Sequence, residues 1–181
     1  HWRELFYRWF LGMVAHWRGI DKQHGNNTSP LLVGPQGYRK STFCRILLPP
    51  ELRFGYTDSI DFKSKQEAER SLGRFFLINI DEFDQINANQ QGFLKHLLQK
   101  PVANLRKPYG STIQEMRRYA SFIGTSNQKD LLTDPSGSRR FICIEVTGPI
   151  QTNVTINYRQ LYAQAMHDIM KGERYWLDDT D

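Results

Sequence analysis

The sequence has few cysteines and no long apolar run. Its 2 cysteines, Cys44 and Cys143, show neither the spacing of a disulfide framework nor that of a zinc site. Both stand in apolar surroundings, so we expect two buried, reduced thiols and a cytoplasmic location. No stretch of about 18 consecutive apolar residues occurs, and charges interrupt the aromatic N-terminal segment. The sequence therefore predicts neither a membrane span nor a signal peptide.

The composition is that of one α/β domain with a substantial core. Hydrophobic residues make up 39% of the 181 residues, and aromatic residues 13%. The net charge is +5 and the pI is near 9.3. This balance is compatible with an anionic partner, but it does not separate a nucleic acid or a nucleotide from plain solubility.

The two ends of the chain each predict one helix. Apolar and aromatic residues recur every three or four positions over residues 1–18, which indicates a helix that packs in a core rather than one that stacks bases. Residues 19–29 read as a linker. The C-terminal segment 151–181 contains a second periodic stretch, 158–171, followed by a tail. Because both ends break off within a pattern, we expect the chain to be part of a longer protein.

The segment 30–50 predicts a phosphate-binding loop. Residues 31–33 form a short buried strand, 34–39 a loop with two glycines, and Lys40 opens a helix that ends before the two prolines. In such a loop the Lys40 amine reaches the β- and γ-phosphates and the Ser41 hydroxyl binds Mg²⁺. The candidate nucleotide-binding residues are Gly34, Pro35, Gln36, Gly37, Tyr38, Arg39, Lys40, Ser41 and Thr42. A chance match is the alternative, and Arg39 stands where the usual pattern has Gly, so we expect Gly37 to supply the backbone freedom.

Two adjacent carboxylates follow the next apolar strand, residues 74–80. Asp81 is a candidate Mg²⁺ ligand, and Glu82 a candidate general base for an attacking water. The carboxyl ends of parallel strands meet at one edge of a sheet, so both should lie beside the phosphate loop. An inert acidic turn is the alternative. We expect Asp84 to cap the following helix.

A further buried strand, 119–127, ends in Asn127, a candidate for orienting the attacking water, although a turn-forming Asn would look the same. Arg139 and Arg140 precede the last strand, 141–146. Either arginine could stabilise charge on the γ-phosphate, in its own site or in a neighbour's. Surface arginine pairs are also common.

Residues 102–119 predict a basic β-hairpin with its turn at 108–110. Its candidate nucleic-acid contacts are Arg106, Lys107 and Tyr109, with Arg117 and Arg118 at the far end. Cationic side chains beside an aromatic ring suit a single strand, by phosphate attraction and base stacking. The alternative is a solvated hairpin whose Tyr109 packs back on the domain.

The ordered motifs GPQGYRKST, LINIDEFD, FIGTSN and DPSGSRRF together resemble the virulence-associated protein E family of P-loop NTPases, which is close to superfamily three helicases and primase-helicases. The resemblance implies an AAA+-like α/β fold, a mostly parallel central sheet flanked by helices, over a core of residues 30–150. It implies the phosphate-loop roles for Lys40, Ser41 and Thr42, acidic-motif roles for Asp81 and Glu82, and a sensor role for Asn127. Arg139 or Arg140 resembles an arginine finger.

The resemblance also implies cofactors and partners. These are ATP and Mg²⁺, single-stranded DNA bound through the hairpin, a homo-oligomeric ring, and a primase-like N-terminal region in the full-length protein of a phage or mobile element. The function expected is that of an ATP-dependent helicase-type motor. Two alternatives remain open: a nucleotide-gated DNA clamp that hydrolyses little ATP, and a P-loop kinase.

Overall fold

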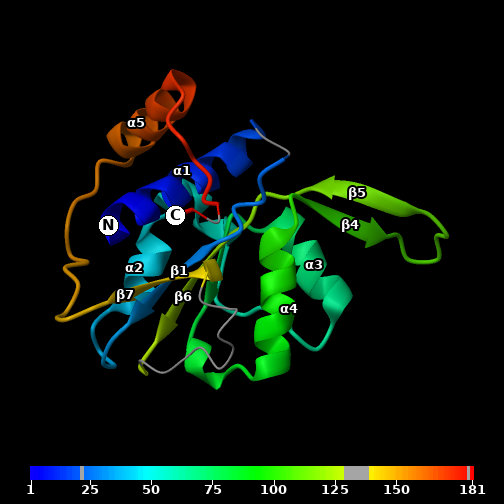
Figure 1. Ribbon diagram of the computed structural model, residues 1–181, viewed down its shortest axis with the longest axis horizontal. Helices are drawn as coiled ribbons and strands as arrows, with labels where there is room; N and C mark the ends of the chain where they lie inside the picture. The colour runs from blue at the N-terminus through cyan, green and yellow to red at the C-terminus, as the bar shows by residue number, and fades with distance from the viewer. Residues whose placement is uncertain (21–22, 129–138, 179) are drawn as a thin grey trace.

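The computed structural model describes residues 1–20, 23–128, 139–178 and 180–181. Within these residues, five parallel strands form a central sheet in the order β2-β3-β6-β1-β7 (Figure 1). The strands are β1 (Ser29–Val33), β2 (Tyr56–Thr57), β3 (Leu77–Ile80), β6 (Ser121–Ser126) and β7 (Phe141–Glu145). The expected mostly parallel α/β sheet is confirmed.

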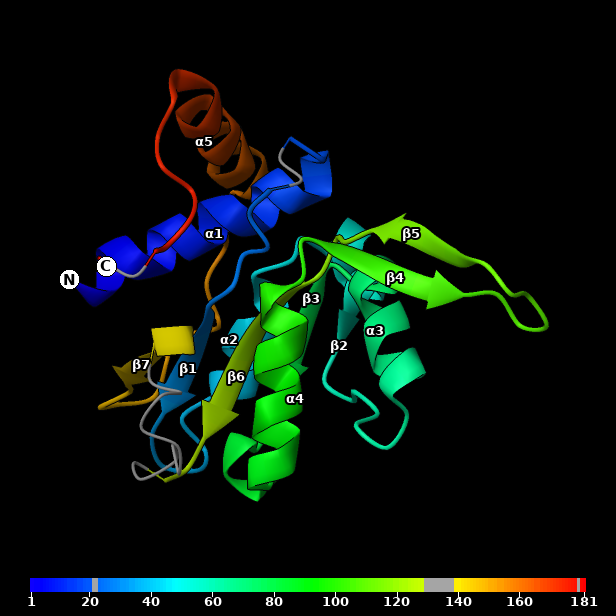
Figure 2. The same cartoon turned by 45° about the vertical axis from the view of Figure 1, so that its right-hand side comes forward.

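Helices cover both faces of this sheet (Figure 2). On one face lie α1 (Trp2–Arg18), α2 (Lys40–Ile46) and α5 (Tyr158–Lys171), and on the other α3 (Lys65–Arg74) and α4 (Ala88–Gln99). Two short 3₁₀ helices, η1 (Pro50–Gly55) and η2 (Phe83–Gln85), lie between these elements. Successive strand residues point to opposite faces, so Leu32 packs with the α1 side and Leu31 with the α3 side.

Burial on both faces explains the apolar runs of the inner strands. Every residue of β1, β3 and β6 is buried, as expected for parallel strands between helices. The edge strands differ. β2 has only 2 residues, and buried and exposed residues alternate at the end of β7. Cys44 is buried as expected, but Cys143 is exposed on β7, so the prediction of two buried thiols is wrong for the edge-strand cysteine.

The aromatic N-terminal helix packs in the core, as its periodicity predicts. Trp9 and Met13 of α1 are 0% exposed, and α1 joins the same hydrophobic cluster as α5 and β7. Its C-terminus ends at Gly19, which has the left-handed φ of 63°. Base stacking by this face is thereby excluded for its buried rings.

Side chains cap the N-termini of α3 and α4. Ser64 accepts a hydrogen bond from the Glu67 N–H at the start of α3, which runs through Gly73 to Arg74. Asp84 does not cap α4. Asn87 does, in a capping box with Gln90, because the chain makes the η2 turn before α4 begins.

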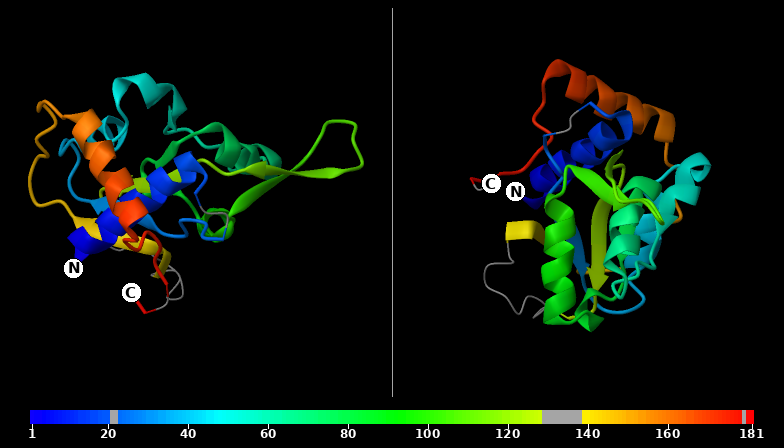
Figure 3. Two further views of the ribbon diagram at one scale, coloured as in Figure 1. Left: turned by 90° about the horizontal axis from the view of Figure 1, so that it is seen from above. Right: turned by 90° about the vertical axis from the view of Figure 1, so that its right-hand side faces the viewer.

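The predicted hairpin is confirmed and stands apart from the central sheet. β4 (Val102–Arg106) pairs antiparallel with β5 (Ile113–Arg117), and the two strands project from the body of the molecule (Figure 3, left). Near its base the hairpin rests on α3, where the Glu69 carboxylate accepts hydrogen bonds from the Lys100 ammonium and the Asn104 N–H.

Two arginines at the base of the hairpin donate hydrogen bonds to the C-terminal carbonyl groups of two helices. The buried Arg118 donates to the carbonyls of Leu97, Leu98 and Lys100 at the C-terminus of α4. Arg117 donates to the carbonyls of residues 16 and 17 at the C-terminus of α1. Burial lowers the pKa of Arg118 to about 9, so the guanidinium stays charged at neutral pH. These two side chains are structural, and the expectation that they add to a nucleic-acid surface is wrong for the buried Arg118.

Among the described residues, no helix is both long enough and apolar enough to cross a membrane.

Candidate functional site

A cavity of about 390 Å³ opens at the carboxyl ends of β1, β3 and β6. Its lining residues are Gln36, Gly37, Arg39, Lys40, Ser41, Thr42, Asp81, Glu82, Thr125, Ser126 and Asn127. The chain leaves β1 towards β2 at one edge of the sheet and leaves β6 towards β7 at the other. Adjacent strands whose connections diverge form the switch point at which open α/β sheets bind ligands.

The backbone of the loop that follows β1 is tightly constrained. A Cβ atom at Gly34 would lie 2.6 Å from the Val146 carbonyl oxygen, so only glycine fits there. Gly37 has φ 86° and Arg39 has φ 60°. The expectation that Gly37 replaces the freedom missing at position 39 is therefore incomplete, because both positions adopt positive φ.

Lys40 lies at the centre of the cavity wall. Its side chain folds back on the loop, and Nζ donates to the carbonyl oxygens of Gly34 at 2.7 Å and Pro35 at 2.8 Å. Nζ also donates to Asn127 Oδ1 at 3.2 Å. Burial lowers the pKa of Lys40, while the charges of Asp81 and Asp84 act in the opposite direction. The ammonium thus connects the loop after β1 to the end of β6.

Ser41 and Asp81 meet across the cavity. The Ser41 hydroxyl donates to Asp81 Oδ1 at 2.6 Å, and the Thr125 hydroxyl donates to the same oxygen at 2.6 Å. Among the described residues, no group of three or more His, Cys, Asp or Glu could hold a metal ion. A hydroxyl and one carboxylate suit Mg²⁺ when phosphate oxygens and waters supply the other ligands, so the residues present fit a nucleotide-bound Mg²⁺.

Glu82 turns out of strand β3 in a left-handed conformation, with φ 53° and ψ 53°. Its side chain is exposed and lines the cavity, and its N–H donates to Thr125 Oγ1 at 3.3 Å. This turn brings both carboxylates to the cavity although adjacent strand residues face opposite ways. The predicted convergence of Lys40, Asp81 and Glu82 is the arrangement that the structure has.

Sequence reasoning missed the two hydroxyl residues at the end of β6. Thr125 binds Asp81 and the Glu82 N–H, and the Ser126 hydroxyl donates to Asp84 Oδ1 at 2.9 Å. Burial acts to raise the pKa of Asp84, but hydrogen bonds from Ser126 and Gln85 leave it lowered on balance. The sequence feature that could have identified them is their position: two small hydroxyl residues stand directly before Asn127.

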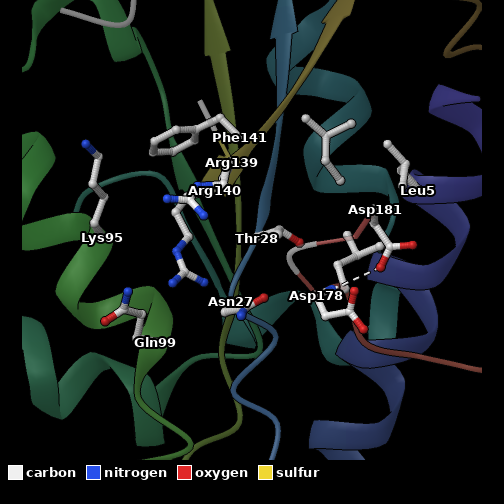
Figure 4. Close-up of a pocket in the computed structure, with 12 residues that line it drawn as sticks. Leu5, Asn27, Thr28, Lys95, Gln99, Arg139, Arg140, Phe141, Asp178 and Asp181 are labelled. Atoms are coloured by element: carbon white, nitrogen blue, oxygen red, sulfur yellow. Dashed lines mark hydrogen bonds between the residues drawn. The ribbon is translucent and has the colours of Figure 1, made fainter. Parts of the chain in front are cut away.

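Arg139 and Arg140 lie at the opposite end of the sheet. Phe141, which follows them, pairs with Ser29, the first residue of β1, so the length of β1, about 13 Å at ~3.3 Å per residue, separates them from the loop. They line another cavity, of about 650 Å³, with Lys95 of α4 and Asp178 of the C-terminal tail (Figure 4). The structure therefore does not bring either arginine to the cavity of its own chain. Residues 134–138, the first part of the fourth motif, lie outside the described residues.

The tip of the hairpin is exposed. Arg106 and Lys107 are exposed, and Tyr109 is 110% exposed with φ 64°. The Gly110 N–H closes the turn on the Lys107 carbonyl at 2.9 Å. The alternative in which Tyr109 packs back on the domain is thus excluded.

The fold and this cavity define an α/β protein with a mainly parallel sheet between helices and a polar, charged cluster at the carboxyl edge of that sheet. The family model of the virulence-associated protein E-like domain matches residues 1–181. The chain therefore belongs to the virulence-associated protein E-like domain family.

Solved structures with the same fold include two of the NrS-1 C-terminal region. One, the A form apo structure, is 15% identical over 96% of this chain and 39% of its own, with a TM-score of 0.54. Another apo structure is 15% identical over 95% of this chain and 40% of its own, with a TM-score of 0.56. The chain thus spans about two fifths of the length of these structures. A comparison with curated proteins gave no match.

Proposed function

We propose that this chain is a P-loop ATPase domain of the AAA+-like, superfamily three helicase type, which hydrolyses ATP with Mg²⁺ to move or remodel DNA. One observation carries the proposal: Lys40, Ser41, Asp81, Glu82 and Asn127 come from three different strand ends and line one cavity. Family membership supports it. If the acidic turn were inert and the glycine loop a chance match, nothing would require the two segments to line the same cavity.

The loop 34–39 and Lys40 bind the triphosphate in this proposal. Loop N–H groups and the ammonium supply donors and positive charge to the phosphate oxygens. The Lys40 amine exchanges the carbonyls of Gly34 and Pro35, to which it is bonded, for the β- and γ-phosphates. Because the ammonium also donates to Asn127, nucleotide binding at Lys40 is coupled to the position of Asn127 at the end of β6.

Glu82 accepts the proton of the attacking water, and Asn127 orients that water for in-line attack on the γ-phosphate. Ser41 and Asp81 hold the Mg²⁺ ion, which when bound neutralises charge on the phosphate oxygens. Glu82 is suited to the role of base because its side chain is exposed and lines the cavity. Asp81, with two hydroxyl donors on one oxygen, is suited to holding the metal.

The arginines complete the site of a neighbouring copy. Arg139 and Arg140 are too far from their own chain's loop, so a role for them in hydrolysis requires an oligomer in which one copy's β7 end faces another copy's cavity. A ring is the closed arrangement that such a head-to-tail interface generates. We propose this homo-oligomer as the active form.

The hairpin tip is the proposed contact to single-stranded DNA. Tyr109 offers an exposed ring for stacking, with Arg106 and Lys107 beside it for phosphates. In the full-length protein we expect a primase-like N-terminal region and a role in phage or mobile-element replication, in the cytoplasm. The likeness to the NrS-1 C-terminal region fits a domain within a longer chain.

Phosphate release with ATP and Mg²⁺ tests the proposal. The parent should hydrolyse ATP faster when single-stranded DNA is added, and Glu82→Gln should bind ATP while turnover falls at least about 100-fold, because the general base is lost. Arg45→Gln, on the exposed surface of α2 away from the cavity, is the control that keeps parental turnover. Hydrolysis by Glu82→Gln at the parental rate would refute the assignment.

The same assay separates the alternatives. A nucleotide-gated clamp would bind ATP and DNA but release little phosphate in the parent. A kinase would transfer phosphate to an acceptor in place of water. The exposed Glu82 beside Asp81 favours water activation over both.

A further inference from the structure

Backbone strain is concentrated at the candidate nucleotide cavity. Among the described residues, the non-glycine residues with positive φ are Asn26, Arg39, Glu82 and Tyr109. Two of them, Arg39 and Glu82, line this one cavity. Strained conformations of bulky residues tend to persist where the side chain serves a function, because glycine would otherwise meet the backbone requirement with less strain.

Arg39 lines the cavity, and the residue is exposed. Its guanidinium Nη1 donates to the Ile150 carbonyl oxygen at 3.3 Å, which is long for this type of bond. Arg39 is also the residue directly before Lys40, whose ammonium is turned back onto the loop carbonyls. The guanidinium therefore has donors to offer a ligand that enters the cavity.

The charges around the cavity give such a ligand a reason to use Arg39. The charged side chains that line it are Arg39, Lys40, Asp81 and Glu82, so their sum is zero with Arg39 and one negative charge without it. A polyphosphate would then meet repulsion before its metal is counted. A cation at position 39 removes this repulsion, and it donates charge-assisted hydrogen bonds to the phosphate oxygens.

We propose that Arg39 is a second phosphate-binding cation of this site, which contacts the phosphates of a nucleoside triphosphate in the same chain as Lys40. This inference rests on the proposed function. The left-handed backbone conformation of Arg39 lowers the stability of the protein. The arginine is kept there because its side chain adds to the affinity for the triphosphate.

The experiment is calorimetric titration of Mg·ATP into the protein, with variants at position 39 and a thermal unfolding scan of each. Arg39→Gln keeps a donor for the Ile150 carbonyl but loses the charge, and should raise Kd about tenfold or more. Arg39→Gly should do the same and raise Tm by about 2 to 4 °C, because the strain is relieved. Arg39→Lys should stay within about threefold of the parent. Arg45→Gln removes an exposed arginine from α2, the helix that follows Arg39, and should change neither quantity.

Three results would overturn the assignment. Parental affinity in Arg39→Gln would show that the charge contacts no phosphate. A lower Tm with unchanged affinity in Arg39→Gly would make the arginine a structural link to Ile150. A Kd for Arg39→Lys as weak as that of Arg39→Gln would exclude a charge contact. Failure of the proposed function looks different, since the parent itself would then bind no Mg·ATP.

Discussion

Thr125 connects the acidic residues of the cavity to strand β6. Its hydroxyl donates to Asp81 and accepts from the Glu82 N–H, and the residue is 3% exposed. One buried hydroxyl therefore fixes both the carboxylate that we assign to the metal and the backbone of the proposed base. A loss of these bonds should displace the acidic turn by a small amount without removing any group that touches the nucleotide's phosphates.

Thr125→Val should lower kcat about 10- to 100-fold and leave Kd for Mg·ATP within about threefold. The magnitude follows from the loss of a hydrogen bond to a charged group, about 1.5–3 kcal/mol, expressed at the reacting geometry. Turnover and titration with the same preparation measure the two quantities. Thr125→Ser keeps the hydroxyl and should recover most of the turnover. Equal kcat in Thr125→Val and the parent would show that this residue only packs.

The sequence predicted the charged members of the cavity and missed the hydroxyl residues that support them. Lys40 was identifiable because it follows an apolar strand and a glycine-containing loop, and Asp81 and Glu82 because they come directly after another apolar strand. Arg118 was not, since nothing in a run of basic residues indicates that one of them is buried against the end of α4. Asp84 was assigned to a helix cap because the contact that it makes, with Ser126, joins residues distant in the chain.

The β4–β5 hairpin combines a fixed base with a free tip. Arg117 and Arg118 tie its base to the C-termini of α1 and α4, where a cation also suits the negative end of the helix. The five residues of β5 are exposed along its length, and Tyr109 projects beyond them. The base of the hairpin is therefore attached to two helices, one on each face of the sheet.

Lys107→Ala combined with Tyr109→Ala should weaken single-stranded DNA binding about tenfold or more and leave basal ATP turnover and Tm unchanged. Stacking on an aromatic ring contributes about 1–3 kcal/mol per base, and the tip supports no packing. Fluorescence anisotropy with a labelled oligonucleotide measures the affinity. The matched control is Lys171→Ala, an exposed lysine at the end of α5. If the tip variant binds as tightly as this control, the hairpin is not the DNA contact.

The elements themselves were largely predictable, because apolar runs, prolines and caps mark their ends. The exceptions lie at the margins of the sheet. Strand β2 is limited to 2 residues, and Cys143 is exposed on β7, since an edge strand lacks the neighbour on its second side that helps to bury a central one. Which strands become edges depends on the order of the sheet, and local patterns do not encode that order.

Two of the cavities that the described residues line are charged and lie at opposite ends of the central sheet. One holds the candidate phosphate loop and the acidic pair, and the other holds Arg139 and Arg140. β1 and β7 are parallel and start level with each other. Rotation of the Arg139 and Arg140 side chains therefore does not bring them to the phosphate loop of the same chain. The pair of cavities is what a head-to-tail assembly would need.

Subunit mixing tests this assembly. Lys40→Ala should be inactive because it binds no nucleotide, and the double variant Arg139→Ala with Arg140→Ala should be inactive because it lacks the partner's charge. Mixed and allowed to exchange, they should recover up to about a quarter of the parental turnover, since some interfaces then pair an intact cavity with intact arginines. Sedimentation must first show that both variants assemble like the parent. Phosphate release that stays at the level of the separate variants would exclude action in trans.

The most direct measurement is the titration of Mg·ATP into the parent and into Lys40→Ala, with Arg45→Gln as the charge-matched control. If the ammonium of Lys40 and the carboxylates of Asp81 and Glu82 surround one triphosphate, the parent and the control should bind with equal affinity and the Lys40 variant should give no measurable heat. Equal binding by all three, or no binding by the parent, would contradict the account.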